Sequence, residues 1–132
     1  MGRQAVKITA DTNILIRAIV ADDPEQARLA QNVLQTAELV AVPIVALCEM
    51  VWVLARGYRI ASPDIGAALR QLLSSANVAV DRPAAEAGLA ALFRGGDFAD
   101  GVIAHEGRML GGDIFVSFDK QAVALAGGRV PT

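Results

Sequence analysis

Apolar positions recur at two spacings along the chain, and the points where the spacing changes predict its elements. Val6 and Ile8 alternate as in a strand, with Ala10 in phase, whereas the dense apolar run at residues 14–20 suits a buried helical turn. Asp11 stands where one spacing gives way to the other. The same pattern predicts helices at residues 24–37, 44–56, 62–75, 83–93, 98–110 and 121–126, and strands at residues 39–42, 78–80 and 114–117, with a fifth strand near Val130.

Local signals mark several of these boundaries. Asp23 followed by Pro24 is typical of a helix start, and Gly57 ends the helix that begins after Pro43. Strands that alternate with helices need crossover connections, which produce a parallel sheet covered on both faces. The sequence therefore predicts one α/β domain over residues 1–132, with three layers and a mostly parallel sheet of four to five strands flanked by helices.

The composition is typical of a folded cytoplasmic protein. With 132 residues, 54% of them hydrophobic, the chain is long enough for a core and too apolar for disorder. Its mean hydropathy of +0.42 is high for a free monomer, so we expect a partner to cover part of the surface. The single cysteine, Cys48, excludes an internal disulfide, and the N-terminus lacks the pattern of a signal peptide.

The positions of charged residues and the net charge bear on two further possibilities, a membrane-spanning segment and a nucleic-acid partner. The apolar stretch at residues 39–55 is barely long enough to span a membrane and contains Pro43 and a central Glu49, so a buried strand and helix explain it better. The net charge of −2 argues weakly against nucleic acid. If four of the 14 acids form a cluster, however, 10 acids remain against 12 Lys and Arg, which permits an RNA partner.

Four carboxylates stand out, although each also has a structural explanation. Asp11 follows the first strand and Asp119 follows a later one, and either side chain is also well placed to cap the next helix. Glu49 has only apolar neighbours three and four positions away, so it is expected to be paired, protonated or metal-bound if that face is buried, and otherwise to reach water at the edge of the face or pair with an arginine. Asp100 lies in the first turn of its helix, after Asp97 at the N-cap.

Together the four acids predict a metal site. The carboxyl ends of parallel strands and the beginnings of the following helices share one edge of the sheet. Carboxylates that converge there repel one another unless a cation lies between them, and a set without His or Cys selects Mg²⁺ or Mn²⁺. Such a site supports cleavage of phosphate esters by activated water. The acids expected at this edge are Asp11, Glu49, Asp100 and Asp119.

These acids lie in four segments that read A-D-T-N-I-L-I-R, L-C-E-M-V-W-V-L, D-F-A-D-G-V-I-A and F-V-S-F-D-K-Q-A in chain order. The segments resemble the PIN-domain ribonucleases, and most closely the VapC-type toxins of bacterial toxin–antitoxin modules. The resemblance covers nearly the whole chain. It implies Mg²⁺- or Mn²⁺-dependent hydrolysis of single-stranded RNA, with Asp11 and Asp100 as principal metal ligands and Glu49 and Asp119 completing the site. It also implies a VapB-type antitoxin and a homodimer.

The resemblance assigns roles to several neighbouring side chains. Thr12, Asn13 and Ser117 correspond to polar residues that donate hydrogen bonds around the acids. Asp97 recurs in similar D-F-x-D segments as a cap or accessory residue. Gly101 stands where relatives often have Ala, a departure expected to loosen its helix.

Other residues receive weaker assignments from charge and spacing. Lys120 is the better candidate for binding RNA phosphate, and Arg17 is a second one. His105 is rotated away from the acids on its helix, so we do not assign it as a general base. Cys48 and Trp52 are expected in the core.

Other functional classes remain open on the sequence. A receiver-like phosphoacceptor domain would use Asp81, but Thr12 stands where it needs a second acid and Gln121 where it needs proline. A haloacid-dehalogenase-type phosphatase would need Asp in place of Asn13. If every acid is only a helix cap, the chain is a non-catalytic binding protein. RNA cleavage lost in Asp11→Asn would favour the nuclease, and acetyl-phosphate labelling of Asp81 the receiver.

Overall fold

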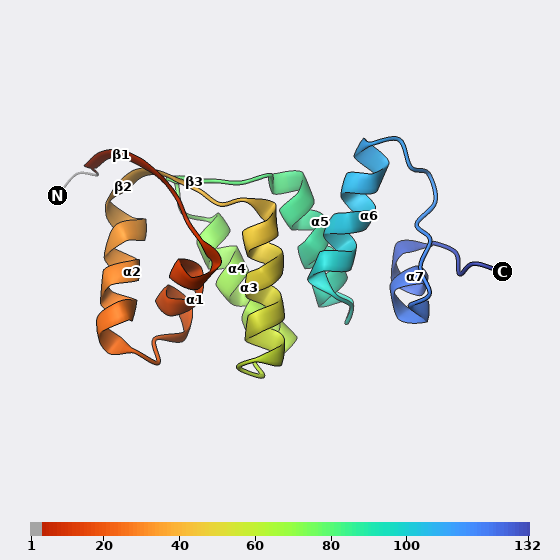
Figure 1. Cartoon of the computed structure of the whole chain (residues 1–132), viewed down its shortest axis with the longest axis horizontal. Helices are drawn as coiled ribbons and strands as arrows, with labels where there is room; N and C mark the ends of the chain where they lie inside the picture. The colour runs from red at the N-terminus through yellow and green to blue at the C-terminus, as the bar shows by residue number, and fades with distance from the viewer. Residues whose placement is uncertain (1–3) are drawn as a thin grey trace. The chain divides into compact units, whose positions relative to one another are not determined.

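A parallel sheet organises the first part of this computed structural model, which describes residues 4–132. The chain forms two units, residues 1–81 (unit 1) and residues 82–132 (unit 2). Unit 1 contains the sheet and helices α1–α4, and unit 2 contains α5–α7 (Figure 1). The first three residues of the predicted domain lie outside the described residues, and the single-domain assignment stays a prediction.

The sheet of unit 1 has the strand order β1–β2–β3, and all its pairs are parallel. β1 (Gln4–Thr9) pairs with β2 (Ala37–Ala41), and β2 pairs with β3 (Val78–Ala79). Val40 of the central strand lies opposite both Ile8 and Val78 and has no exposed surface. This arrangement confirms the predicted α/β fold with a parallel sheet flanked by helices.

The helices of unit 1 begin at signals carried by the sequence. Asp23 Oδ1 accepts a hydrogen bond from the Gln26 N–H at 3.1 Å, which fixes the start of the second helix. The first helix begins two residues earlier than predicted, because Asp11 caps it. The four helices are α1 (Thr12–Val20), α2 (Pro24–Thr36), α3 (Ile44–Arg56) and α4 (Ser62–Leu73).

The core of unit 1 uses one side of α3. Leu47, Met50 and Leu54 have no exposed surface, whereas Trp52 is 59% exposed and Cys48 is half-buried. The expectation that Trp52 is a core residue is therefore wrong. Because α3 is apolar nearly all round, its periodicity alone did not identify which stripe faces the core.

Unit 2 is built on close packing between two helices, α5 (Arg82–Phe93) and α6 (Phe98–Met109). A Cβ at Gly88 would lie 2.6 Å from the buried ring of Phe98, and a Cβ at Gly101 would lie 2.5 Å from the carbonyl oxygen of Ala87. Gly101 therefore permits a close helix–helix approach rather than loosening its helix. The last helix is α7 (Lys120–Ala126).

The strand predicted at residues 114–117 forms no ladder in the described part of unit 2. Val116 makes one isolated parallel bridge with Arg129, through hydrogen bonds of 3.2 Å and 2.8 Å on either side. Ile114, Val116 and Phe118 alternate as in a strand, but all three are exposed. The described structure thus has three strands, not four or five, because strand formation needs a paired neighbour as well as a suitable sequence.

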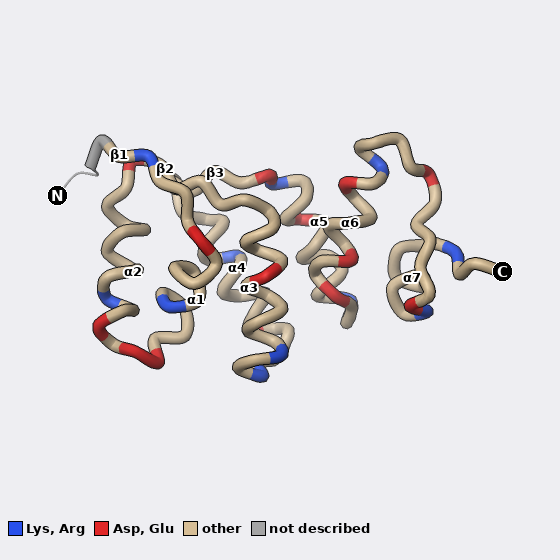
Figure 2. The backbone as a smooth tube through the Cα atoms, in the orientation of Figure 1, with Lys and Arg blue, Asp and Glu red and all other residues tan. Residues whose placement is uncertain are grey.

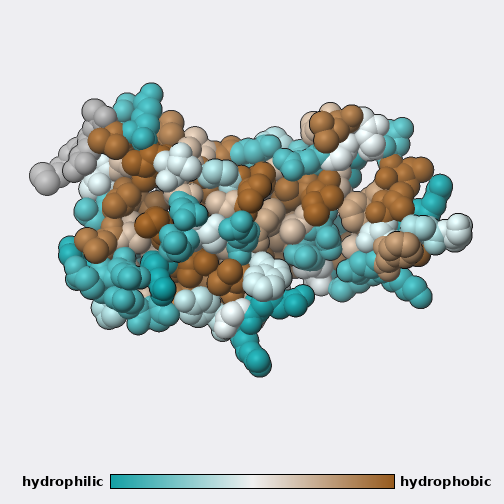
Figure 3. Space-filling model, in the orientation of Figure 1, coloured by the Kyte–Doolittle hydropathy of each residue, from teal (hydrophilic) through white to brown (hydrophobic). Residues whose placement is uncertain are grey.

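Apolar side chains reach the surface in both units, and Figure 3 shows them interspersed with hydrophilic residues on the face in view. None of the helices in the described residues is long and apolar enough to cross a membrane. Large apolar residues that are at least 40% exposed include Leu29, Val33, Val45 and Trp52 in unit 1, and Ile103, Met109, Leu110 and Phe118 in unit 2.

Candidate functional site

In unit 1 a single residue, Thr12, donates hydrogen bonds to both candidate acids. Its backbone N–H donates to Asp11 Oδ1 at 2.8 Å, and its hydroxyl donates to Glu49 Oε2 at 2.9 Å. The first bond caps α1, where a carboxylate is also stabilised by the helix dipole. The second bond links the start of α1 to the middle of α3. The structure therefore brings Asp11 and Glu49 together at the carboxyl end of β1, as the sequence predicted for these two acids.

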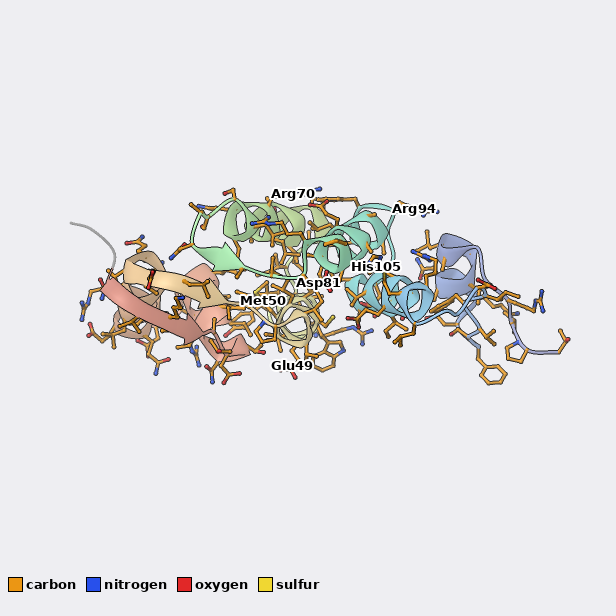
Figure 4. The ribbon with its side chains drawn as sticks, turned by 90° about the horizontal axis from the view of Figure 1, so that it is seen from above. Glu49, Met50, Arg70, Asp81, Arg94 and His105 are labelled. Carbon is orange, nitrogen blue, oxygen red and sulfur yellow. The ribbon has the colours of Figure 1, made fainter. Side chains whose placement is uncertain are left out.

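Of the two alternatives for Glu49, burial on an apolar face is the one that the structure contradicts. Glu49 is exposed, and its apolar neighbours Val45 and Trp52 are 63% and 59% exposed. In Figure 4 Glu49 points outward from α3, while the next residue, Met50, points into unit 1. The apolar residues around Glu49 belong to the outer face of the helix, so the acid needs no buried partner.

Unit 2 holds the other acids at the starts of its helices. Asp97 Oδ1 accepts from the Ala99 N–H at 3.1 Å and caps α6. Asp119 Oδ1 accepts from the backbone N–H groups of Gln121 and Ala122 at 3.0 Å and 3.1 Å and caps α7, whose acidic start is visible in Figure 2. Within the described residues, the Oδ2 atom of each aspartate makes no protein hydrogen bond.

Ser117 supports the loop that carries Asp119. Its hydroxyl accepts a hydrogen bond from the Asp119 N–H at 3.0 Å, so it contacts the backbone of the acid rather than the carboxylate. Gln121 anchors the same region by donating to the Gly95 carbonyl at 2.9 Å. The start of α7 is thereby tied to the turn between α5 and α6.

Asp100 is an acid of unit 2 whose ionised form is disfavoured by its surroundings. Its partial burial, together with the negative charges of Asp97 and then Asp119, raises the pKa of its carboxyl above the usual 3.8. Asp97 and Asp119 therefore each repel the ionised form of Asp100. A bound cation would relieve that repulsion.

These three acids line one pocket of about 330 Å³, which also contains two arginines, Arg94 and Arg108. Among the described residues, neither arginine makes an ion pair with an acid of the pocket; the ion pairs Arg17–Asp22 at 3.1 Å and Arg28–Glu25 at 2.7 Å lie elsewhere in the chain. Figure 4 shows Arg94 projecting outward at the end of α5. The pocket thus combines unneutralised carboxylates with cationic side chains available to a ligand. Its floor is formed by small residues, Ala87, Ala90, Ala91, Gly101, Ala104, Ala122 and Ala126.

Sequence reasoning missed both pocket arginines. A signal for Arg108 was present, because residues 97, 101, 104 and 108 follow one face of α6 at helical spacing. Arg94 lies just past the end of α5 and before the glycine pair, so its side chain falls on the pocket only because of the turn that joins α5 to α6. That turn geometry has no simple sequence signature.

The remaining residues predicted to bind substrate or orient the acids lie at the surface in different environments. The Arg17 guanidinium contacts Asp22, which also accepts a hydrogen bond from the Tyr58 hydroxyl at 3.2 Å. Asn13 is exposed and lines a separate hollow with Arg17. Lys120 is exposed at the first position of α7. Their roles in substrate binding or in orienting the acids stay predictions.

The chemistry of the acids fits a hard divalent cation, since all the donors are carboxylate oxygens and the caps occupy one oxygen of each capping aspartate. Their spacing does not by itself form a coordination shell: no group of three or more acidic, His or Cys side chains in the described structure is arranged to hold one ion. Asp11 and Glu49 belong to unit 1, and Asp97, Asp100 and Asp119 to unit 2. That all four predicted acids share one ion stays a prediction.

Comparison with models of protein families shows which family the chain belongs to. A model of the PIN domain matches residues 8–128. The chain belongs to the PIN domain family. PIN domains are generally metal-dependent nucleases, which makes a hydrolase acting on nucleic acid the general function of this fold. No curated protein matched the chain.

One solved structure that aligns with nearly the whole chain is the crystal structure of PAE2754 from Pyrobaculum aerophilum. It is 24% identical in sequence, and the alignment covers 98% of this chain and 86% of that one. The TM-score is 0.36, so this likeness adds nothing to the family assignment.

Proposed function

We propose that this PIN domain is an Mg²⁺- or Mn²⁺-dependent endoribonuclease that hydrolyses phosphodiester bonds in single-stranded regions of RNA. The observation that carries the proposal is the unit 2 pocket, where Asp97, Asp100 and Asp119 line one cavity together with Arg94 and Arg108, neither of which forms an ion pair with these acids in the described part of the chain. A phosphodiester brings the negative oxygens that such arginines bind, and the acids provide ligands for a divalent ion.

In this proposal each residue has a separate task. Each of the four predicted acids, Asp11, Glu49, Asp100 and Asp119, would serve as a metal ligand. Thr12 keeps both unit 1 carboxylates oriented through its two hydrogen bonds. A divalent ion held by these residues would supply Lewis acidity and lower the pKa of water. In-line attack of water on the phosphorus would break the bond to the 3′-oxygen, which would take up a proton and leave as a 3′-hydroxyl, with a 5′-phosphate on the other product. Asp97 keeps the start of α6 in place.

The two pocket arginines would bind phosphate oxygens of the substrate. Because each side chain is exposed and lacks an acidic partner, its charge is available without breaking an existing ion pair. Replacing either arginine by alanine should weaken RNA binding at all sequences alike and reduce the salt dependence of binding by about one charge. Arg28→Ala, which removes a guanidinium already paired with Glu25, is the matched control.

The proposal is tested by incubating the purified chain with 5′-labelled single-stranded RNA in Mg²⁺, Mn²⁺ or EDTA. We expect cleavage with either ion, none in EDTA, and loss of cleavage in Asp11→Asn and Asp100→Asn. Glu106→Gln is the control, because Glu106 is an exposed acid on the same helix as Asp100 but lies outside the pocket. Cleavage that survives in Asp100→Asn would contradict the assignment.

We further propose that the chain is the toxin of a VapBC-type module, which acts as a homodimer and is neutralised by a VapB-type antitoxin. Support comes from the resemblance of its four acidic segments and from exposed apolar residues such as Leu29 and Val33, which line a hollow between α1 and α2. Controlled expression should arrest growth, and Asp100→Ala should restore it. Sequencing the new RNA ends in arrested cells would identify the substrate.

The two alternatives predict different results. A receiver-like domain would be labelled by acetyl phosphate at Asp81, and a non-catalytic binding protein would leave RNA intact in every metal. RNA cleavage that depends on Asp11 and Asp100 excludes a non-catalytic binding protein. Absence of acetyl-phosphate label on Asp81 excludes a receiver-like domain.

A further inference from the structure

The outer face of α3 presents an exposed tryptophan beside a candidate catalytic acid. Trp52 is the one tryptophan of the chain and is 59% exposed, although large aromatic side chains are usually mostly buried. Leu47, Met50 and Leu54 occupy the opposite, buried side of the same helix. The exposure of Trp52 therefore follows from the packing of α3 in unit 1.

Helical spacing places Trp52 next to Glu49. Residues 49, 52 and 56 share one face, because an α-helix has 3.6 residues per turn. Side chains on a helix lean toward its N-terminus, so the indole at position 52 covers the turn that contains Glu49. Glu49 is itself fixed by the Thr12 hydroxyl, and exposed Arg56 follows one turn beyond Trp52.

We propose that Trp52 is a stacking platform for an unpaired base of the RNA substrate, with Arg56 binding a neighbouring backbone phosphate. The inference rests on the proposed ribonuclease function and adds a residue that selects single-stranded substrate. An aromatic ring combined with a basic side chain is the usual way of holding single-stranded nucleic acid, since every base has a face that stacks and every nucleotide a phosphate.

The surroundings of Trp52 favour RNA over a protein partner. Of the residues three and four positions from Trp52, Glu49 and Arg56 are charged and Cys48 and Ala55 are small, and Val45 is the other large, strongly exposed apolar side chain of α3. A stable protein interface usually has an apolar centre depleted of charge, which this arrangement lacks. A carboxylate next to the ring also matches the candidate site, where cleavage would take place.

The single tryptophan makes the test direct, because all intrinsic indole fluorescence comes from Trp52. We would titrate the non-cleaving Asp100→Asn chain with an unstructured single-stranded oligoribonucleotide and with an abasic backbone of the same length. Stacking predicts that the RNA quenches the fluorescence strongly and that the abasic backbone does not. Anisotropy of a labelled RNA measures binding independently of the tryptophan.

Variants in the same non-cleaving background separate stacking from other roles. Trp52→Ala should weaken RNA binding by about tenfold, within the range for loss of one stacked base, while Trp52→Phe should keep most of the affinity. Val45→Ala is the control, since Val45 is equally exposed on the same helix face but has no aromatic ring, and its affinity should stay within about twofold. Circular dichroism checks that each variant is folded.

Three results would overturn the inference. RNA that binds by anisotropy without quenching Trp52, or binds Trp52→Ala as tightly as the parent, excludes stacking. A blue shift of the fluorescence that grows with protein concentration and without RNA assigns the face to a second copy of the chain. If the wild-type chain still cleaves RNA, any of these results rejects only the stacking role of Trp52 and leaves the proposed ribonuclease function standing. If the wild-type chain cleaves no RNA in Mg²⁺ or Mn²⁺, both the stacking role and the ribonuclease function are rejected.

Discussion

The two units differ in how they hold the candidate carboxylate that does not cap a helix, Glu49 in unit 1 and Asp100 in unit 2. In unit 1, Asp11 and Glu49 each accept a hydrogen bond from Thr12, at 2.8 Å and 2.9 Å, and both are exposed. In unit 2, Asp100 is partly buried and faces two further acids without a donor among the described residues. Unit 1 thus orients both of its acids by hydrogen bonds, whereas unit 2 holds Asp100 near two acids whose negative charges a bound cation would offset. The difference makes Asp100 the carboxylate whose substitution tests metal binding most directly.

The largest effect is expected from Asp100→Asn on activity. The substitution keeps the shape of the side chain and removes the negative charge. Because Asp100 is a proposed metal ligand, cleavage of single-stranded RNA should fall by more than the roughly 100-fold typical of an outer-shell partner. Initial cleavage rates in saturating Mn²⁺ measure this loss, and Glu106→Gln should remain within about twofold of wild type.

A second prediction concerns the packing of unit 2 through two glycines of α6. A Cβ at Gly101 would lie 2.5 Å from the Ala87 carbonyl oxygen and 2.8 Å from the Ala91 Cβ, so Gly101→Ala should cost about 1–3 kcal/mol of unfolding free energy. Gly107 has no atom within 4 Å of such a Cβ, and Gly107→Ala should stabilise the helix by up to about 1 kcal/mol. Urea unfolding measures both changes, and equal signs would contradict the packing.

Thr12→Val tests whether the hydrogen bonds of unit 1 matter. Valine keeps the backbone N–H that caps α1 with Asp11 but removes the hydroxyl that donates to Glu49. We expect cleavage to fall by about 10- to 100-fold, with a loss of stability below about 1 kcal/mol because both groups are accessible to water. Thr12→Ser retains the hydroxyl and should restore activity; failure to do so would show that the methyl group, not the hydrogen bond, is needed.

The smallest expected effect is a pH dependence of stability. Since the pKa of Asp100 is raised in the folded state, the native protein binds more protons than the unfolded chain between pH 3.8 and that raised pKa. The unfolding free energy contributed by this group therefore falls as the pH rises through that window and stays lower at neutral pH. Asp100→Asn should then be more stable than wild type at pH 7, by up to about 0.5 kcal/mol.

Denaturant midpoints measured from pH 3 to pH 8 test this prediction. The advantage of Asp100→Asn should shrink as the pH falls, because the wild-type carboxyl becomes neutral too. An advantage that grows on acidification would contradict the raised pKa. Added Mn²⁺ should reverse the order at neutral pH if the ion binds the wild-type pocket.

Helix positions in this chain were predictable because their signals are local. Asp23 and Pro24 begin α2 and Gly57 follows α3, and the predicted start and end of α3 agree with the structure. The prediction of a strand at residues 114–117 was wrong because strand formation is not local. The apolar residues of this segment do alternate as in a strand, but a ladder also needs a paired neighbouring strand, and the described structure provides only a bridge to Arg129.

The candidate site was predictable as a set of residue types but not as an arrangement. The sequence identified Asp11 and Asp119 as either caps or site residues and Asp100 as a first-turn acid or a metal ligand, and the structure makes Asp11 and Asp119 caps through one oxygen of each side chain. It did not indicate that Arg94 and Arg108 share a pocket with the acids. Pocket membership depends on the turn between two helices, which spacing along a single helix does not reveal.

The sequence by itself determined the alternation of strands and helices, the family-like order of the acids and the helix caps, because each follows from contacts within a few residues. Tertiary structure alone decided which side of the apolar helix α3 is buried, and hence that Glu49 and Trp52 face outward. It also decided that Thr12 contacts Glu49 across 37 positions of the chain. Both outcomes depend on how helices pack against one another, and that packing is set by shape complementarity between distant segments.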